Sequence, residues 1–543
     1  MVEDIDVDVV VAGSGVGGLM AAYHAQRSGA KVLLLGGSGG ASQRISSLNT
    51  ALGYDEQDTP TGLFDDMFRA GGYVNTPAVV AAMVHRIGAE TLHLVDLGVP
   101  FLRDQDRLAR RQAAGSTWTR AVFSEGMIGA DIARRLTAEL AKCSAPAVVQ
   151  VKGGLLLELL TDAGRVTGAL AYSPRERRWV RAGAGAVVLA TGGAGQLFGT
   201  TTNPRGSRGI GYVVALEAGA ELMDMEFVSF EPFVTSAPED LRGQDLPTTV
   251  LREGARLRNG EGEEFLDTSK APTKDIICRA MVREVLEGRG TASGSILFDL
   301  REMEPENAHR YVGIEEALRS RGMTSREAQL EVMPAQHYLM GGVRIDAAGA
   351  STLPGLFAVG EVSGGAHGGH RLAAGGGLEV VAGGAIAGES AARHSLEHQR
   401  SKPSVRAADP RPELLPTSLS EMSKSDLATI QNALDGGCGI LRHGEDLAKS
   451  IEAIGRVLER SSDSADRFVH RSAIVALSIA KSALERTESR GDHFRIDHPQ
   501  RDDTRWIANL VVALSEHGDL ELRCERAGVA TRHPVEASTP QLV

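Results

Sequence analysis

The chain has 543 residues and carries 70 acidic against 58 basic side chains, which gives a formal net charge of −12. This acidic balance, with no long block of Lys and Arg, argues against a nucleic-acid-binding protein and against docking on an anionic membrane surface. The length allows three to four domains of about 150 residues, so the chain is long enough to bury a large core.

Cysteine use and the N-terminal residues favour a cytoplasmic protein. The four cysteines include no CxxC motif, so the usual spacing for an iron–sulfur cluster or a redox disulfide is missing. The first eight residues include four acidic side chains and no basic one, so they lack the basic start of a signal peptide. No uninterrupted apolar run reaches the roughly 18–20 residues of a spanning helix, and no transmembrane segment is expected.

The N-terminal region reads as a βαβ unit with glycines in its first turn. Residues 6–12 form a β-branched run, residues 19–28 a helical stretch and residues 31–35 a second apolar run. Between the first two lies Gly13-Ser14-Gly15-Val16-Gly17-Gly18. With 64 glycines in the chain, the bare motif has little weight, but a position between strand and helix is what a dinucleotide fingerprint requires.

The rest of the chain divides into further α/β segments, an insert and a helical end. A second buried strand at 186–190 also ends in glycines. The alternation of strands and helices is lost at residues 225–335 and returns at 355–361. A polar stretch with four prolines then marks a linker. Helical apolar spacing occurs at 78–97, 129–141, 426–434, 445–460 and 464–485.

Seven segments, in order along most of the chain, resemble the flavoprotein subunits of succinate dehydrogenase and fumarate reductase, and L-aspartate oxidase. They include the first glycine turn, an Ala-Thr-Gly-Gly-Ala-Gly turn after the second strand, and a His-Gly-Gly-His-Arg loop. The segments are 13–18, 190–195, 224–232, 252–259, 337–342, 360–371 and 489–497. One such match could be accidental, but seven in family order identify the chain as a member.

The resemblance implies an α/β fold, with a Rossmann-like FAD-binding domain, an inserted α+β capping domain and a C-terminal helical domain. The expected boundaries are 1–224 and 340–398 for the FAD-binding domain, 225–339 for the capping domain, 399–420 for a linker and 421–543 for the helical domain. The FAD should be non-covalent, because no histidine occurs between His24 and His85, where membrane succinate dehydrogenases carry a flavin-linking histidine.

The resemblance assigns the cofactor contacts mainly to glycine turns. Gly13 and Gly15 would let backbone N–H groups approach the pyrophosphate at the positive end of the following helix. Gly36 stands where the family has an acid for the adenosine ribose, so the backbone, a side chain such as Ser42, or water must hold the ribose. The full set is Gly13, Ser14, Gly15, Gly17, Gly18, Gly36, Ser46, Ser47, Ala190, Thr191, Gly192, Gly193, Gly360, Glu361, Gly376, Gly377 and Leu378.

The resemblance also places a substrate carboxylate between Arg371 and His337. Arg371 offers a planar fork that matches a carboxylate, and His337 can donate a hydrogen bond to it. Glu231 replaces a substrate-binding histidine, and Leu251 replaces a proton-relaying arginine. Glu231 has three open roles: partner of Arg371, binding group for a substrate ammonium, or general base. Arg252, one residue after the relay position, is a candidate substitute.

A histidine pair near the substrate arginine mimics a metal motif. His367 and His370 flank two glycines, and such spacing on a loop can hold a metal ion. The family alignment accounts for both histidines without a metal, so no metal site is predicted.

These residues predict an FAD-dependent oxidase or dehydrogenase that oxidises a C–N or C–C bond next to a carboxylate. The substrate is expected to be a small amino-acid-like or dicarboxylate-like molecule, with hydride transfer to flavin N5. Glu231 beside an amine favours C–N oxidation. Electrons would leave to O₂, a quinone or a partner protein, because the chain lacks iron–sulfur cysteines.

Three alternatives stay open. The first is interconversion of the fumarate reductase or succinate dehydrogenase type, which the missing relay arginine disfavours. The second is a dehydrogenase of a bulkier apolar, ketosteroid-like substrate. The third is a flavin-carrying electron-transfer subunit without turnover of its own. Apolar residues that could line a pocket for the second are Met223, Met225, Phe227, Phe230 and Phe233.

Overall fold

The computed structural model describes residues 2–37, 39–143, 145, 147–246, 248–268, 272–303, 318–398, 411–415, 421–461 and 467–528. At its centre lies a parallel sheet in the order β20-β13-β2-β3-β9. Its strands are β2 (Val9–Ala12), β3 (Val32–Gly36), β9 (Val148–Lys152), β13 (Ala186–Leu189) and β20 (Leu356–Ala358). Every residue of β2 and β13 is buried, as expected where both faces of a parallel sheet are covered.

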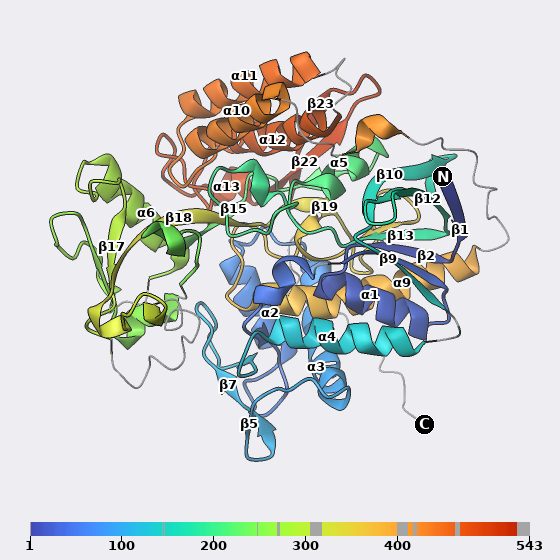
Figure 1. The fold of residues 1–543 in the computed structure, drawn as a ribbon, viewed down its shortest axis with the longest axis horizontal. Coiled ribbons are helices and arrows are strands. Elements are labelled where there is room, and N and C mark those ends of the chain that lie inside the picture. The colour runs from blue at the N-terminus through green and yellow to red at the C-terminus, as the bar shows by residue number, and fades with distance from the viewer. Residues whose placement is uncertain are drawn as a thin grey trace.

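Helices cover one face of the central sheet, and a second sheet lies over the other (Figure 1). α1 (Val16–Arg27) packs against α4 (Ile128–Lys142) and α9 (Gly384–Glu397). The second sheet has the order β1-β12-β11-β10. Its strands are β1 (Val2–Asp6), β10 (Leu155–Asp162), β11 (Arg165–Ser173) and β12 (Arg178–Gly183).

The insert forms a separate lobe with its own core, at the left of Figure 1. Its sheet has the order β15-β18-β17-β16. The elements are β15 (Val228–Ala237), β16 (Arg256–Arg258), α6 (Lys274–Leu286), β17 (Ile296–Asp299) and β18 (Gln329–Leu339). Phe233 and Phe298 stack in its core with ring centroids 4.6 Å apart. We call this lobe the cap.

The C-terminal region combines a helical bundle with two strands. α10 (Glu421–Gly437), α11 (Gly444–Ser461) and α12 (Arg467–Glu485) pack on one another. β22 (Ala508–Leu514) and β23 (Leu520–Arg526) extend a sheet of order β21-β19-β14-β22-β23. Its other strands are β14 (Leu222–Met223), β19 (Gly342–Arg344) and β21 (Ser363–Gly364). The helices were predicted from the sequence, but the two strands, which tie this region to the α/β core, were not.

The remaining helices and several short strands complete the wall around the α/β core. The helices are α2 (Pro60–Ala70), α3 (Pro77–Asp96), α5 (Ile210–Glu217), α8 (Gly375–Leu378) and α13 (Asp503–Trp506). The strands are β4 (Leu48–Asn49), β5 (Arg103–Asp104), β6 (Arg107–Leu108), β7 (Arg110–Arg111) and β8 (Ala121–Val122). Short 3-10 turns include η1 (Gly40–Arg44) and η4 (Thr248–Glu253).

One described helix, α3, is long and apolar enough to cross a bilayer, with a mean hydropathy of 1.2. It packs against α2 and buries side chains such as Val80, Met83 and Ile87. Core helices of soluble proteins pass the same test of length and composition.

The α/β fold with an inserted cap and a C-terminal helical region agrees with the predicted class. The predicted boundaries of the parts stay predictions, although β15 to β18 fall within 225–339. Within the predicted linker at 399–420, only residues 411–415 are among those described, and the predicted helix start at 464 lies outside them.

Candidate active site

A cavity of about 2640 Å³ opens between the C-terminal ends of the central strands and the cap. Typical small-molecule sites measure about 300–1,000 Å³, so this one has room for a dinucleotide and a substrate together. Most of the predicted cofactor residues line it: Gly13, Ser14, Gly15, Gly17, Gly36, Ser46, Ser47, Ala190, Thr191, Gly192, Gly193, Gly360, Glu361, Gly376 and Gly377. Gly18 and Leu378 are buried and are not among the described lining residues.

The two predicted glycine turns touch each other at one end of the cavity. Gly13 has φ +122° and donates its N–H to Leu35 O at 2.8 Å. A Cβ on Gly13 would lie 2.0 Å from Ala190 O, so only glycine fits there. Gly15 is the N-cap of α1 and has no side chain to occupy the first-turn N–H groups, which form an anion site at a helix N-terminus.

One buried polar group in this wall lacks a hydrogen-bond partner, as expected where a cofactor binds. Among the described residues, Thr191 Oγ1 is buried without a hydrogen-bond partner, and it lines the cavity beside Gly192. A buried hydroxyl without a partner is costly, and a ligand atom would supply one. Together with the N-terminus of α1, this hydroxyl makes the wall suitable for a cofactor that carries phosphate groups.

Gly36 explains why the expected ribose acid is missing. The residue ends β3 with φ +131°, and a Cβ there would lie 2.8 Å from Ser14 Oγ. An acid at this position would meet both backbone strain and the Ser14 side chain. Ser42, whose Oγ faces Gly15, also lines the cavity and remains a candidate for the ribose.

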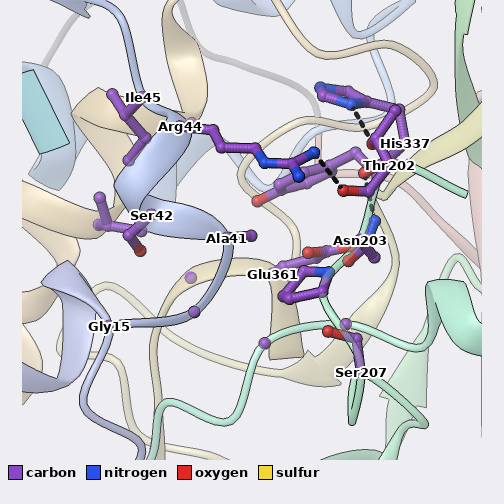
Figure 2. Close-up of a pocket in the computed structure, with 18 of the residues that line it drawn as sticks. Gly15, Ala41, Ser42, Arg44, Ile45, Thr202, Asn203, Ser207, His337 and Glu361 are labelled. Atoms are coloured by element: carbon purple, nitrogen blue, oxygen red, sulfur yellow. Dashed lines mark hydrogen bonds between the residues drawn. The ribbon is translucent and has the colours of Figure 1, made fainter. Parts of the chain in front are cut away.

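Glu361 lies between the cofactor wall and the cap (Figure 2). Its Oε1 accepts a hydrogen bond from Leu339 N at 3.0 Å. A Cβ on Gly193 would lie 2.1 Å from the same oxygen, so glycine at 193 makes room for this carboxyl. Burial raises the pKa of Glu361 to about 8.

His337 is fixed by the loop that follows the second glycine turn. The Thr202 hydroxyl lies 2.8 Å from His337 Nδ1, and Asn203 Nδ2 donates to His337 O at 2.8 Å (Figure 2). Burial, together with the positive charges of Lys274 and Arg371, lowers the pKa of His337 well below its ordinary value. The ring is therefore neutral and serves as a hydrogen-bonding group rather than a charge.

Arg371 faces the same cavity from the loop before α8. Its guanidinium stacks over the Tyr338 ring at 4.5 Å, and the Tyr338 hydroxyl donates to buried Glu379. Among the described residues, Arg371 Nε is buried without a hydrogen-bond partner. A cation held on an aromatic face, with a donor left over, is suited to binding a carboxylate.

The structure gives Glu231 a partner that the sequence analysis did not identify. Glu231 is 4% exposed, and its Oε2 pairs with Lys274 Nζ and lies 3.8 Å from His337 Nε2. Pairing with Arg371, one of the three roles left open for Glu231, is not found among the described residues. Lys274 is the first residue of α6, where a cation opposes the helix dipole and is stabilised by a nearby anion.

The structure describes Leu251 at the predicted relay position but not the side chain of Arg252, the candidate substitute. Leu251 is 7% exposed and belongs to the core of the cap, so it lies among apolar side chains. Arg252 falls in the turn η4, and its side chain lies outside the described residues. Arg252 stays a candidate on sequence grounds alone.

The two loop histidines have acidic partners within the fold. His367 Nε2 lies 3.1 Å from Glu379 Oε2, and His370 Nδ1 lies 3.0 Å from Asp492 Oδ2. Within the part of the chain that the structure describes, no group of three or more His, Cys, Asp or Glu side chains could hold a metal ion. The two contacts tie the loop that carries Arg371 to Glu379 and Asp492.

The five apolar residues considered for binding a bulky apolar substrate are not among the described residues that line the cavity. Four of the five, Met223, Met225, Phe227 and Phe233, are at most 3% exposed. The substrate end of the cavity is polar instead, with Ser229, Glu231, Lys274, His337 and Arg371.

Comparisons with known proteins agree with this architecture. The model of the FAD binding domain matches residues 8–377, and that of the fumarate reductase flavoprotein C-terminus matches residues 467–539. The chain is 34% identical to L-aspartate oxidase of Streptomyces coelicolor, over 94% of this chain and 92% of the relative. It is 30% identical to a fumarate reductase (CoM/CoB) chain of Methanothermobacter marburgensis, over 91% of this chain and 95% of the relative.

A solved structure extends the likeness to three dimensions. A variant of FrdA from Escherichia coli quinol fumarate reductase matches 98% of this chain and 99% of its own, with a TM-score of 0.86 and 26% sequence identity. The cofactor is therefore FAD, and the protein is an FAD-dependent oxidoreductase.

Proposed function

Because the chain belongs to the flavoprotein family of succinate dehydrogenase, fumarate reductase and L-aspartate oxidase, we propose that it oxidises a small carboxylate substrate at the bond next to the carboxylate. The substrate class is an amino acid or a dicarboxylate, and the bond is C–N or C–C. The observation that carries this proposal is that Arg371 and His337 line one cavity with the glycine turns of the cofactor wall.

The charges at the substrate end favour an anion. Arg371, Lys274 and Arg44 are cations near a neutral His337, since their charges all lower its pKa, and Glu231 offsets one of them. A desolvated site with an excess of positive charge attracts carboxylates and repels cations. A diacid, with or without an amino group, suits this balance better than a monoacid.

FAD supplies the acceptor for a hydride when it is bound. The side chains would fix the substrate for that transfer: Arg371 would hold a carboxylate through its fork, and neutral His337 would donate a hydrogen bond to it. Thr202 keeps the His337 ring in place from the side away from Glu231. Fixing a substrate in this way can lower the activation free energy by several kcal/mol.

Anaerobic reduction of the bound flavin tests the proposal. FAD-loaded protein is mixed with L-aspartate, succinate and related amino diacids, and the loss of the oxidised flavin spectrum is followed. Bleaching by at least one of them supports the proposal. Silence with all of them, while dithionite still reduces the flavin, overturns it and favours an electron-transfer subunit without its own turnover.

The electron acceptor and the place of action belong to the same proposal. We infer a cytoplasmic enzyme that passes electrons to O₂, a quinone or a partner protein. Stoichiometric hydrogen peroxide under air supports O₂ as acceptor. Rapid reduction of a quinone or a dye without peroxide supports the other two.

A further inference from the structure

Two arginines that line the cavity, Arg371 and Arg208, have a buried Nε atom without a hydrogen-bond partner among the described residues. Arg371 lies at the substrate end, where a carboxylate is expected to bind. Arg208 lies in the loop before α5 and belongs to no site predicted from the sequence. Because a buried donor without a partner is costly, the surroundings of Arg208 indicate which ligand would satisfy it.

Arg208 lies at the adenosine side of the cavity. Its guanidinium stacks over the ring of Phe468 of α12 at 4.8 Å. One turn later on α12, Arg471 donates a hydrogen bond to Leu157 O of β10 at 2.7 Å. β10 follows directly after β9, which pairs with β3 and its last residue, Gly36. Since Gly36 stands where the family binds the adenosine ribose, this end of the cavity is the one that receives the adenosine half of FAD.

The cofactor wall lies close to the same loop. Arg208 comes two residues before α5, and a Cβ on Gly211 in the first turn of α5 would lie 2.1 Å from Thr191 Oγ1. Thr191 carries the buried hydroxyl that lacks a partner among the described residues. Figure 2 shows Ser207, the residue before Arg208, on the opposite side of the pocket from Gly15. The loop of Arg208 therefore faces the N-terminus of α1 across the cavity.

Arg208 is a cation without a counter-charge in the described part of the chain. Its neighbour Arg471, by contrast, donates through Nε to Glu217 Oε1 at 3.0 Å. Burial lowers the pKa of Arg208, and no acidic side chain opposes this shift. The guanidinium stays charged nevertheless, because its ordinary pKa lies far above neutral pH. A partly desolvated cation with a free donor is suited to binding an anion.

We propose that Arg208 binds the pyrophosphate of FAD from the side opposite α1, and that Phe468 positions its guanidinium. A guanidinium offers N–H donors in a fixed plane that match phosphate oxygens. The N-terminus of α1 would hold the same group through backbone N–H groups. This contact would anchor the adenosine half of the cofactor without an acid at Gly36. The inference depends on FAD as the cofactor and not on the identity of the substrate.

Three variants test the contact, and a fourth tests charge alone. Arg208→Met removes the guanidinium but keeps an unbranched side chain, Arg208→Lys keeps a charge but not the planar fork, and Phe468→Leu removes the aromatic face. Arg205→Met is the matched control, because Arg205 lines the cavity from the same loop but is exposed. Thermal unfolding of each cofactor-free variant shows whether it folds.

The first readout is the Kd for FAD, obtained by titrating cofactor-free protein and following flavin fluorescence. We expect Arg208→Met to raise this Kd by about 10- to 100-fold, because hydrogen bonds to charged groups are stronger than neutral ones. Arg208→Lys and Phe468→Leu should raise it less, and Arg205→Met should leave it within about 2-fold. Because salt screens charges, added NaCl should weaken FAD binding by the unchanged protein more than by Arg208→Met.

Competition against FAD identifies the part of the cofactor that Arg208 contacts. ADP contains the pyrophosphate, whereas adenosine has no phosphate. Arg208→Met should therefore weaken the binding of ADP as much as that of FAD and leave adenosine binding unchanged.

The stability of the cofactor-free protein separates ligand binding from a structural role. Because the Arg208 Nε has no partner before the cofactor binds, cofactor-free Arg208→Met should unfold at the same temperature as the unchanged protein or at a higher one. FAD should then raise the unfolding temperature of this variant less than that of the unchanged protein.

Four results would each overturn the inference. An Arg208→Met Kd for FAD within about 3-fold of the unchanged protein refutes it, and so does an equal loss in Arg205→Met. An equal loss of adenosine binding assigns Arg208 to the adenine ring instead. A cofactor-free Arg208→Met protein that unfolds at a clearly lower temperature gives Arg208 a structural role. If the FAD-loaded unchanged protein binds added inorganic pyrophosphate and FAD-loaded Arg208→Met does not, Arg208 serves a separate phosphate ligand.

Discussion

The contact between the two glycine turns allows a quantitative test with Gly13→Ala. Gly13 has φ +122°, and a Cβ there would lie 2.0 Å from Ala190 O. The backbone strain costs about 1–3 kcal/mol. Since carbon and carbonyl oxygen in contact stay about 3.3 Å apart, the turns must also separate by about 1 Å. We expect the Kd for FAD to rise by about 100-fold, which corresponds to about 2.7 kcal/mol.

The assay is titration of cofactor-free protein with FAD, followed by flavin fluorescence. Gly164→Ala is the matched control, because Gly164 has φ +74° but no atom within 4 Å of an added Cβ. It lies between β10 and β11, so it should lose stability through backbone strain alone and keep its FAD affinity. If Gly13→Ala binds FAD within about 3-fold of the unchanged protein, or if Gly164→Ala loses as much affinity, the contact between the turns does not support FAD binding.

Two further changes test the substrate side of the cavity. Thr202→Val removes the hydroxyl beside His337 Nδ1. The loss of one hydrogen bond worth about 1 kcal/mol should weaken the binding of succinate or fumarate, measured by calorimetry, about 5-fold. An unchanged affinity would show that Thr202 does not hold His337 for substrate binding. Burial raises the pKa of Glu361 from 4.5 to about 8, so the unfolded chain ionises first and the folded protein should lose stability as pH rises between these values, then level off. Glu361→Gln should flatten that slope in urea unfolding of the cofactor-free protein, and an unaltered slope would show that Glu361 is not its source.

Local sequence patterns were sufficient for much of the α/β core. The β-branched run before Gly13 and the apolar run at 31–35 are single buried strands, and their parallel pairing needs only the intervening helix. β22 and β23 were not predicted because they complete a sheet with β14, a partner nearly 300 residues away in the sequence. Whether these residues form strands depends on pairing with a distant segment, which a local sequence pattern does not show.

In the active site, too, residues set by local turns could be predicted from the sequence, whereas contacts between distant segments could not. Gly13 and Gly193 are recognisable because a turn leaves no room for a side chain. The partner of Glu231 was not predictable, because the pair with Lys274 forms only when α6 packs on β15. At Gly36 the sequence lacks the acid that the family uses to bind the adenosine ribose. The structure explains this absence, because a side chain at position 36 would collide with Ser14.

The central claim is that Arg371 holds a substrate carboxylate beside bound FAD. The most direct measurement is anaerobic stopped-flow reduction of the FAD-loaded protein by L-aspartate or succinate, compared with Arg371→Met. We expect full bleaching of the unchanged protein and, in the variant, a loss of about 100-fold in kcat/KM with normal FAD content. Equal reduction of both proteins would contradict it.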